Sequence, residues 1–172
     1  MEQSPSTHIP RSRILDSILT THRVILFISG STVAILIFAQ VVMRYVFNMS
    51  VYGMEELAVF FAFWVYFVGL AYTSWENYHI SADLVPLITK NEKTLNFFRI
   101  FSKGASILIA GFMAYLASIQ VSWFFEKQAS TVELGIPLWI IYALICYGFG
   151  ASAISFAVQL AELIKKKSME EV

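Results

Sequence analysis

Apolar residues dominate four long stretches of the chain, and short polar segments separate these stretches. None of the four contains Lys, Arg, Asp, Glu or His. A helix rises about 1.5 Å per residue, so about 20 apolar residues cross the roughly 30 Å hydrocarbon core of a bilayer. The pattern predicts an all-α integral membrane protein with four transmembrane helices, at residues 24–43, 57–75, 104–125 and 134–161.

Two amphipathic segments predict further helices at the membrane surface. After Pro10, apolar residues recur at helical spacing among arginines, which predicts an N-terminal amphipathic helix. Between spans two and three, Thr89–Glu92 has the form of a capping box, and an apolar helical face follows it. We expect an interfacial helix that lies flat and bends up into the third span; the alternative is a partly ordered surface loop. Residues 1–10 are predicted to be a disordered leader, 11–165 a single membrane domain and 166–172 a tail.

The basic residues give this membrane protein its orientation. The chain is 58% hydrophobic and 14% charged, with no net charge. Ten of its twelve Lys and Arg residues fall in the N-terminal tail, the middle loop and the C-terminal tail, and only Arg44 and Lys127 lie on the other side. The positive-inside rule therefore predicts that both termini and the middle loop are cytoplasmic. We interpret the Lys165–Lys167 run as part of this signal and expect no nucleic-acid partner.

The polar residues favour neither catalysis nor transport by this chain alone. Its one cysteine lies within a span and its three histidines lie outside the spans, so the sequence predicts no metal site and no cofactor. Small proton-coupled exporters need an ionisable group within a span to bind or carry charge, and the spans contain none. A self-sufficient small transporter and a membrane anchor of another complex stay open as alternatives.

Small and amide side chains within the spans are candidates for helix packing. Small residues let helix backbones approach closely in lipid, and amide side chains hydrogen-bond across helices. The glutamines Gln40, Gln120 and Gln159 fit the second role. Small residues also recur at four-residue spacing and so form stripes along two spans. These stripes could pack either against helices of the same domain or against another subunit. Their residues are Ala110, Ala114, Ser118 and Ser122 in the third span, and Gly148 and Ser152 in the fourth.

The loop between the first two spans is the most distinctive stretch. Arg44 ends the first span, and Glu55 and Glu56 begin the second, where a helix dipole stabilises negative charge. The two glutamates are adjacent and therefore point about 100° apart on a helix. We consider two interpretations for this pair. One is a dipole cap with an ion pair to Arg44, and the other is a contact with a partner subunit.

These residues are part of a longer series of motifs, in which the chain resembles the small membrane subunit of tripartite ATP-independent periplasmic (TRAP) transporters, the DctQ-like proteins. The resemblance covers about residues 24–162 and keeps the four-span plan. One departure is Gly53, where the family often has a Trp two residues before the Glu pair. The motifs are Arg44–Asn48, Glu55–Ala58, Gly69, His79-Ile80 with Asp83, and Ile136-Pro137 with Tyr142.

The resemblance implies a supporting role in a sodium-coupled importer of the bacterial inner membrane. In that family a periplasmic binding protein captures a carboxylate solute, such as sialic acid or a C4-dicarboxylate. A large multi-span, DctM-like subunit transports the solute, and the small subunit braces its scaffold within the membrane lipid. A share in docking the binding protein is a further expectation. The candidate interface or motif residues are Arg44, Asn48, Glu55, Glu56, His79, Asp83, Pro137 and Tyr142.

Overall fold

Four long α-helices make up the part of the chain that the structure, a computed structural model, describes: residues 13–76 and 92–170. The helices are α1 (Arg13–Tyr45), α2 (Met54–Glu76), α4 (Glu92–Lys127) and α5 (Leu138–Glu170). Between them, the described loops contain an isolated β-bridge from Ser130 to Pro137. Each helix is long and apolar enough to cross a membrane. The prediction of an all-α protein with four spans is confirmed.

Three helices are longer than the bilayer core requires. α1, α4 and α5 have 33, 36 and 33 residues, which is about 50, 54 and 50 Å of helix. The surface helix expected after Pro10 is not separate, because its residues from Arg13 onward are the first turns of α1. Similarly, α4 runs from Glu92 into the third span as one helix. Neither helix contains a proline, the commonest cause of a sharp kink, and no break separates either expected surface segment from its span within the described residues. The part of the interfacial segment before Glu92 lies outside the described residues.

The fourth span begins later than the apolar pattern predicts. The hydrophobic run starts at Leu134, but α5 starts at Leu138. Pro137 therefore lies immediately before the helix, in the β-bridge with Ser130, and not within the first turn. The four residues before Leu138 are apolar or glycine, so hydropathy alone does not separate them from the helix.

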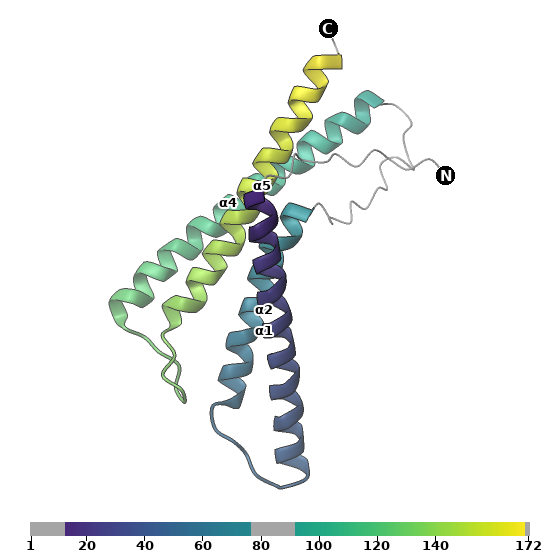
Figure 1. The fold of residues 1–172 in the computed structure, drawn as a ribbon. Helices are drawn as coiled ribbons and strands as arrows, with labels where there is room; N and C mark the ends of the chain where they lie inside the picture. Colours follow the sequence, from purple (N-terminus) through teal and green to yellow (C-terminus); the bar gives the residue numbers. More distant parts are fainter. Residues whose placement is uncertain (1–12, 77–91, 171–172) are drawn as a thin grey trace.

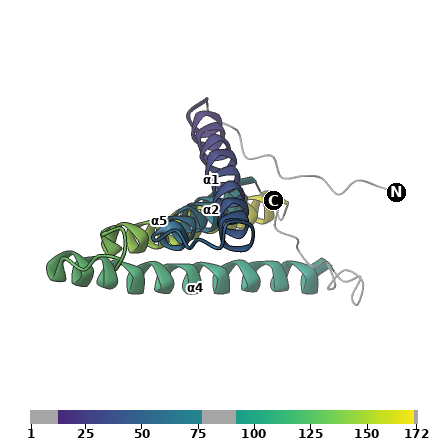
Figure 2. The same cartoon turned by 90° about the horizontal axis from the view of Figure 1, so that it is seen from below.

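The helices form an open layer in the order α1, α2, α5, α4. α2 contacts α1 on one side and α5 on the other, and α5 contacts α4. Figure 2 shows α1 and α4 on opposite sides of the central α2 and α5. The α1–α2 pair and the α4–α5 pair diverge towards one end of the molecule (Figure 1). We call this the loop end, because residues 46–53 and 128–137 join the helices there. In no span are more than 22% of the residues buried.

Close contact between α2 and α5 depends on a small residue of α5. A Cβ atom at Gly148 would lie 2.7 Å from the Phe67 carbonyl oxygen of α2, so the two backbones meet where only glycine fits. One turn on, the Ser152 hydroxyl lies 2.8 Å from the Gly148 carbonyl oxygen and 3.3 Å from the Leu70 carbonyl oxygen of α2. Gly148 and Ser152, singled out in the sequence for packing, thus lie in the α2–α5 contact.

The contact between α4 and α5 uses half of the small-residue stripe of α4. Ala110 is buried, and the Ala114 carbonyl oxygen accepts a hydrogen bond from the Cys146 thiol at 3.6 Å. Ser118 and Ser122 are exposed instead. A four-residue step turns about 400° around a helix, so each step moves a stripe sideways by about 40°. After two steps, at Ser118, the stripe has left the face that meets α5, and the contact continues at the buried Ala117 instead.

Candidate functional site

The motif residues gather at the loop end, and Asn48 shapes the first loop there. Asn48 has φ 52°, a left-handed conformation that asparagine tolerates better than most residues. The turn lets the Met49 amide donate to the Met43 carbonyl oxygen at 3.0 Å, beyond the end of α1. The same loop ends at Gly53, which has φ 80°. Asn48 therefore has a backbone role, reversing the chain between α1 and α2.

The second loop, residues 128–137, folds back on itself. The Thr131 amide donates to the Ile136 carbonyl oxygen at 2.9 Å, and the Ile136 amide donates to the Thr131 hydroxyl oxygen at 3.0 Å. Pro137 closes this small hairpin opposite Ser130. The loop therefore has a defined shape before α5 begins.

Glu56 joins the two loops. Its carboxylate accepts hydrogen bonds from the backbone amides of Glu133 and Leu134, both at 2.9 Å. In return, the Glu133 carboxylate accepts a hydrogen bond from the Gly53 amide. A Cβ atom at Gly53 would lie 2.7 Å from the Leu134 side chain, so this position combines positive φ with a close approach. We call Gly53, Glu56, Glu133 and Leu134 the loop clamp.

Glu55 has a different partner from its neighbour. Its carboxylate accepts a hydrogen bond from the Gln40 side-chain amide of α1 at 2.7 Å, while the residue itself is exposed. Arg44 is also exposed, and within residues 13–76 and 92–170 no ion pair joins it to either glutamate. The ion pair considered from the sequence is therefore not formed. Glu56 is engaged within the chain, whereas Arg44 and Glu55 present charge at the surface.

Tyr142 packs at the start of α5, and apolar side chains are exposed around the clamp. The Tyr142 ring stacks on Phe124 of α4, with ring centroids 4.6 Å apart. In the loops, Tyr52 is 83% and Val132 97% exposed. We call the exposed apolar residues of the two loops and their edges the loop-end patch: Tyr45, Val46, Phe47, Met49, Val51, Tyr52, Val132 and Leu134. His79 and Asp83, the other motif candidates, lie outside the described residues.

A polar cluster at the opposite end joins three helices. The Ser74 carbonyl oxygen, in the last turn of α2, accepts hydrogen bonds from the Ser155 hydroxyl at 2.6 Å and the Gln159 amide at 2.8 Å. The Gln159 side-chain oxygen accepts a third bond, from the Lys103 ammonium of α4, at 2.5 Å. The last carbonyls of a helix have no partner within it, so α5 supplies donors that α2 lacks. We call these four residues the Ser74 cluster.

The sequence indicates part of this cluster in advance. Gln159 was expected to bond to a neighbouring helix, and the spacing of Gly148, Ser152, Ser155 and Gln159 alternates between four and three residues, which keeps them on one face. Lys103 is one of the basic residues of the middle loop that predict the orientation, and the sequence did not predict its contact with α5. Within the described residues, no group of three His, Cys, Asp or Glu side chains is placed to hold a metal ion.

Comparison with known proteins places the chain in a family. A family model described as "Tripartite ATP-independent periplasmic transporters, DctQ component" matches residues 33–166. A search of curated proteins gave no match. The family match covers most of the chain, including the Ser74 cluster and the whole loop end. The chain therefore belongs to the DctQ component family of tripartite ATP-independent periplasmic transporters, whose members are the small membrane subunits of these transporters.

Proposed function

We propose that this chain is the scaffold subunit of a sodium-coupled TRAP importer for an organic acid, such as sialic acid or a C4-dicarboxylate. Its partners are a large DctM-like subunit, which holds the substrate and sodium sites, and a periplasmic solute-binding protein. The complex lies in the bacterial inner membrane with both termini of this chain in the cytoplasm. The family match carries the proposal. The ten basic residues on one side support the orientation.

The open layer supports a bracing role. Each of its helices buries few side chains within the chain, which leaves broad apolar faces for a larger membrane partner. The four apolar stretches contain no Lys, Arg, Asp, Glu or His, so they provide no group that binds or carries charge across the membrane. Such a chain is suited to hold a moving subunit in place.

The loop end supports a docking role in the same complex. The loop clamp holds both loops in one arrangement with two carboxylates and backbone amides. The loop-end patch then lies beside the exposed charges of Arg44 and Glu55. With both termini cytoplasmic, this surface faces the periplasm, where it meets the binding protein, the large subunit or both.

Co-purification tests the proposal most directly. The tagged chain is extracted from native membranes in mild detergent, and the proteins that accompany it are identified. One large multi-span protein in about equal amount supports the scaffold role, and solute uptake by the reconstituted complex then identifies the substrate. A chain that purifies alone as a stable oligomer contradicts it and favours a self-sufficient transporter.

Charge reversal tests the docking surface. Glu55→Lys changes an exposed carboxylate, so we expect weaker uptake at limiting binding protein while assembly with the large subunit persists. Glu126→Lys is the matched control, because Glu126 is an exposed glutamate in the last turn of α4, which also lies at the loop end. Equal uptake by both variants and the unaltered complex would contradict a docking role for Glu55.

A further inference from the structure

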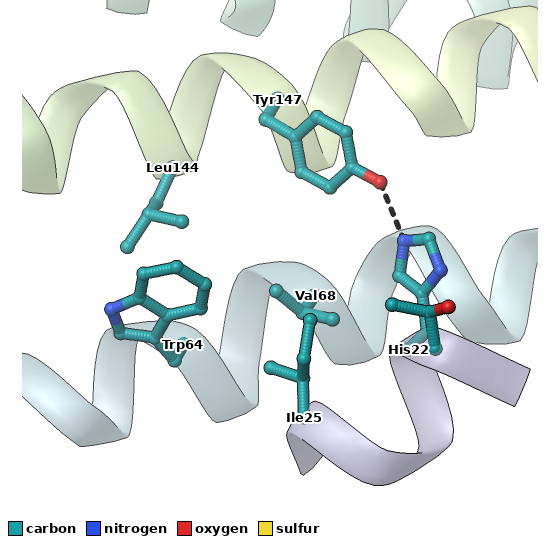
Figure 3. A pocket seen from close by; sticks show the side chains of 7 residues that line it. His22, Ile25, Trp64, Val68, Leu144 and Tyr147 are labelled. Carbon is teal, nitrogen blue, oxygen red and sulfur yellow. Dashed lines mark hydrogen bonds between the residues drawn. The ribbon is translucent and has the colours of Figure 1, made fainter. Parts of the chain in front are cut away.

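A cavity lies between α1, α2 and α5, and it extends from Thr21 and His22, just before the predicted span of α1, to Trp64 and Leu144 within the predicted spans of α2 and α5. Its volume is about 310 Å³, and most of its lining surface is apolar. α2 forms the floor, because it contacts both α1 and α5. Figure 3 shows the residues of the three helices that face one another across it: His22, Ile25, Trp64, Val68, Leu144 and Tyr147.

A hydrogen bond closes one end of this groove. The His22 Nδ1 atom lies 2.6 Å from the Ile18 carbonyl oxygen, to which it donates. His22 Nε2 therefore accepts a hydrogen bond from the Tyr147 hydroxyl, at 2.5 Å. This pair bridges α1 and α5, two helices whose backbones are not neighbours in the described part of the chain. From the bridge, the groove runs along α2 towards Trp64 (Figure 3).

The closed end and the lining of the groove decide what kind of molecule fits. The His22–Tyr147 bridge blocks a helix from running along the groove. The polar groups of Thr21, His22 and Tyr147 already bond within the chain, and the Trp64 indole N–H is the one buried lining group among the described residues without a partner, so most of the groove offers water no hydrogen bond. In a bilayer, the remaining neighbour is the acyl chain of a lipid, which is flexible, apolar and present along the whole span.

We propose that this groove holds one acyl chain of a membrane phospholipid, which packs between α1 and α5 over Trp64 and Val68. The acyl chain supplies the dispersion contacts that the separated walls of the groove otherwise lack. It also couples α1 to α5 along a length where they share no direct backbone contact. This occupancy does not depend on which solute the complex moves.

Photo-crosslinking in native membranes identifies the occupant. Ile25 is replaced by the photoreactive p-benzoylphenylalanine in the full chain, together with whatever subunit co-purifies, and Ile28 is replaced in the same way as a control for ordinary surrounding lipid. Ile28 lies on the same helix and is 56% exposed. After irradiation, the membranes are extracted and the detergent is exchanged. A phospholipid adduct at Ile25 is expected, and an adduct with a second protein or no adduct at all would overturn the proposal.

Filling the groove gives a second, independent measurement. Ile25→Phe and Leu144→Phe each place a larger side chain where the acyl chain lies, whereas Ile28→Phe makes the same change outside the groove. Phospholipid retained after detergent exchange is quantified by mass spectrometry. We expect the unaltered chain and Ile28→Phe to retain about one phospholipid more per chain than the two groove variants. Added phospholipid should also raise the Tm of the unaltered chain more than that of a groove variant. Equal retention in all four proteins would contradict a bound acyl chain.

Discussion

Replacing Gln159 by leucine tests the strongest set of contacts between helices. Gln159 is 6% exposed, and its amide nitrogen donates both to the Ser74 carbonyl oxygen and to the Ser155 hydroxyl oxygen, at 2.8 and 3.0 Å. Its side-chain oxygen accepts from the Lys103 ammonium, which also lies 5.2 Å from the centre of the Phe156 ring. Leucine has a similar size, so Gln159→Leu removes these bonds without opening a large cavity.

The expected loss follows from the number and kind of these bonds. Hydrogen bonds between membrane helices contribute about 0.6 kcal/mol on average and about 1.7 kcal/mol at most. Gln159→Leu removes one neutral bond between helices, to the Ser74 carbonyl oxygen, which amounts to about 0.6–1.7 kcal/mol, while its bond to Ser155 lies within α5. Its bond to Lys103 is charge-assisted, and such bonds contribute about 1.5–3 kcal/mol. The flexible lysine regains part of this by turning towards the lipid headgroups. We therefore expect a decrease of about 2–4 kcal/mol in the free energy of unfolding.

Reversible unfolding measures this decrease. The chain in mixed micelles is titrated with SDS and followed by circular dichroism. Gln120→Leu is the matched control, because Gln120 is exposed on α4 and makes no side-chain hydrogen bond to any described residue. A double-mutant cycle with Lys103→Met isolates the charged bond. A loss below about 0.5 kcal/mol for Gln159→Leu, or one no larger than in the control, would refute the assigned role of the Ser74 cluster.

Three further substitutions test other contacts. Gly148→Ala forces a methyl group against the α2 backbone and should lower the free energy of unfolding by about 1–3 kcal/mol in the same titration. Gly150→Ala is the control, because a methyl group there has open space, and it should raise that free energy by about 0.5–1 kcal/mol. Equal effects of the two substitutions would contradict the close contact of α2 and α5. Glu56→Ala should speed hydrogen exchange of the two loop amides that its carboxylate holds by about tenfold or more, and Glu55→Ala should leave it unchanged. Gly53→Ala should cost about 1–2 kcal/mol of stability, because its φ of 80° disfavours any side chain, and an unchanged titration midpoint would refute this.

The spans could be predicted from the sequence because membrane insertion depends on local hydropathy. The predicted stretches at residues 24–43, 57–75 and 104–125 each lie inside an observed helix. The fourth was placed four residues too early, because hydropathy does not register the β-bridge that holds Pro137 outside α5. The described residues of the two expected surface segments continue into α1 and α4 without a break, since an amphipathic pattern does not itself interrupt a helix.

The contacts of the loop end could not be predicted from the sequence, for a different reason. The sequence places Glu56 correctly at a helix start, but its partners are backbone amides 77 and 78 positions later. Every residue except proline carries such an amide, so no pattern in the sequence marks these two. The small-residue stripe of α4 was predicted correctly for only part of its length. A four-residue spacing finds Ala110 and Ala114, but only the alternating three- and four-residue spacing follows the helix face as far as Ala117.

The open layer ties the lifetime of this chain in the cell to its partner. An unassembled copy keeps its helices but leaves most residues of each span exposed or only partly covered. Such a copy opens more easily and is a better substrate for membrane proteases than an assembled one. We therefore expect its steady-state level to fall when the large subunit is not made, at unchanged transcription. Synthesis in excess would then be corrected by turnover, so that the membrane holds this chain in proportion to the subunit it supports.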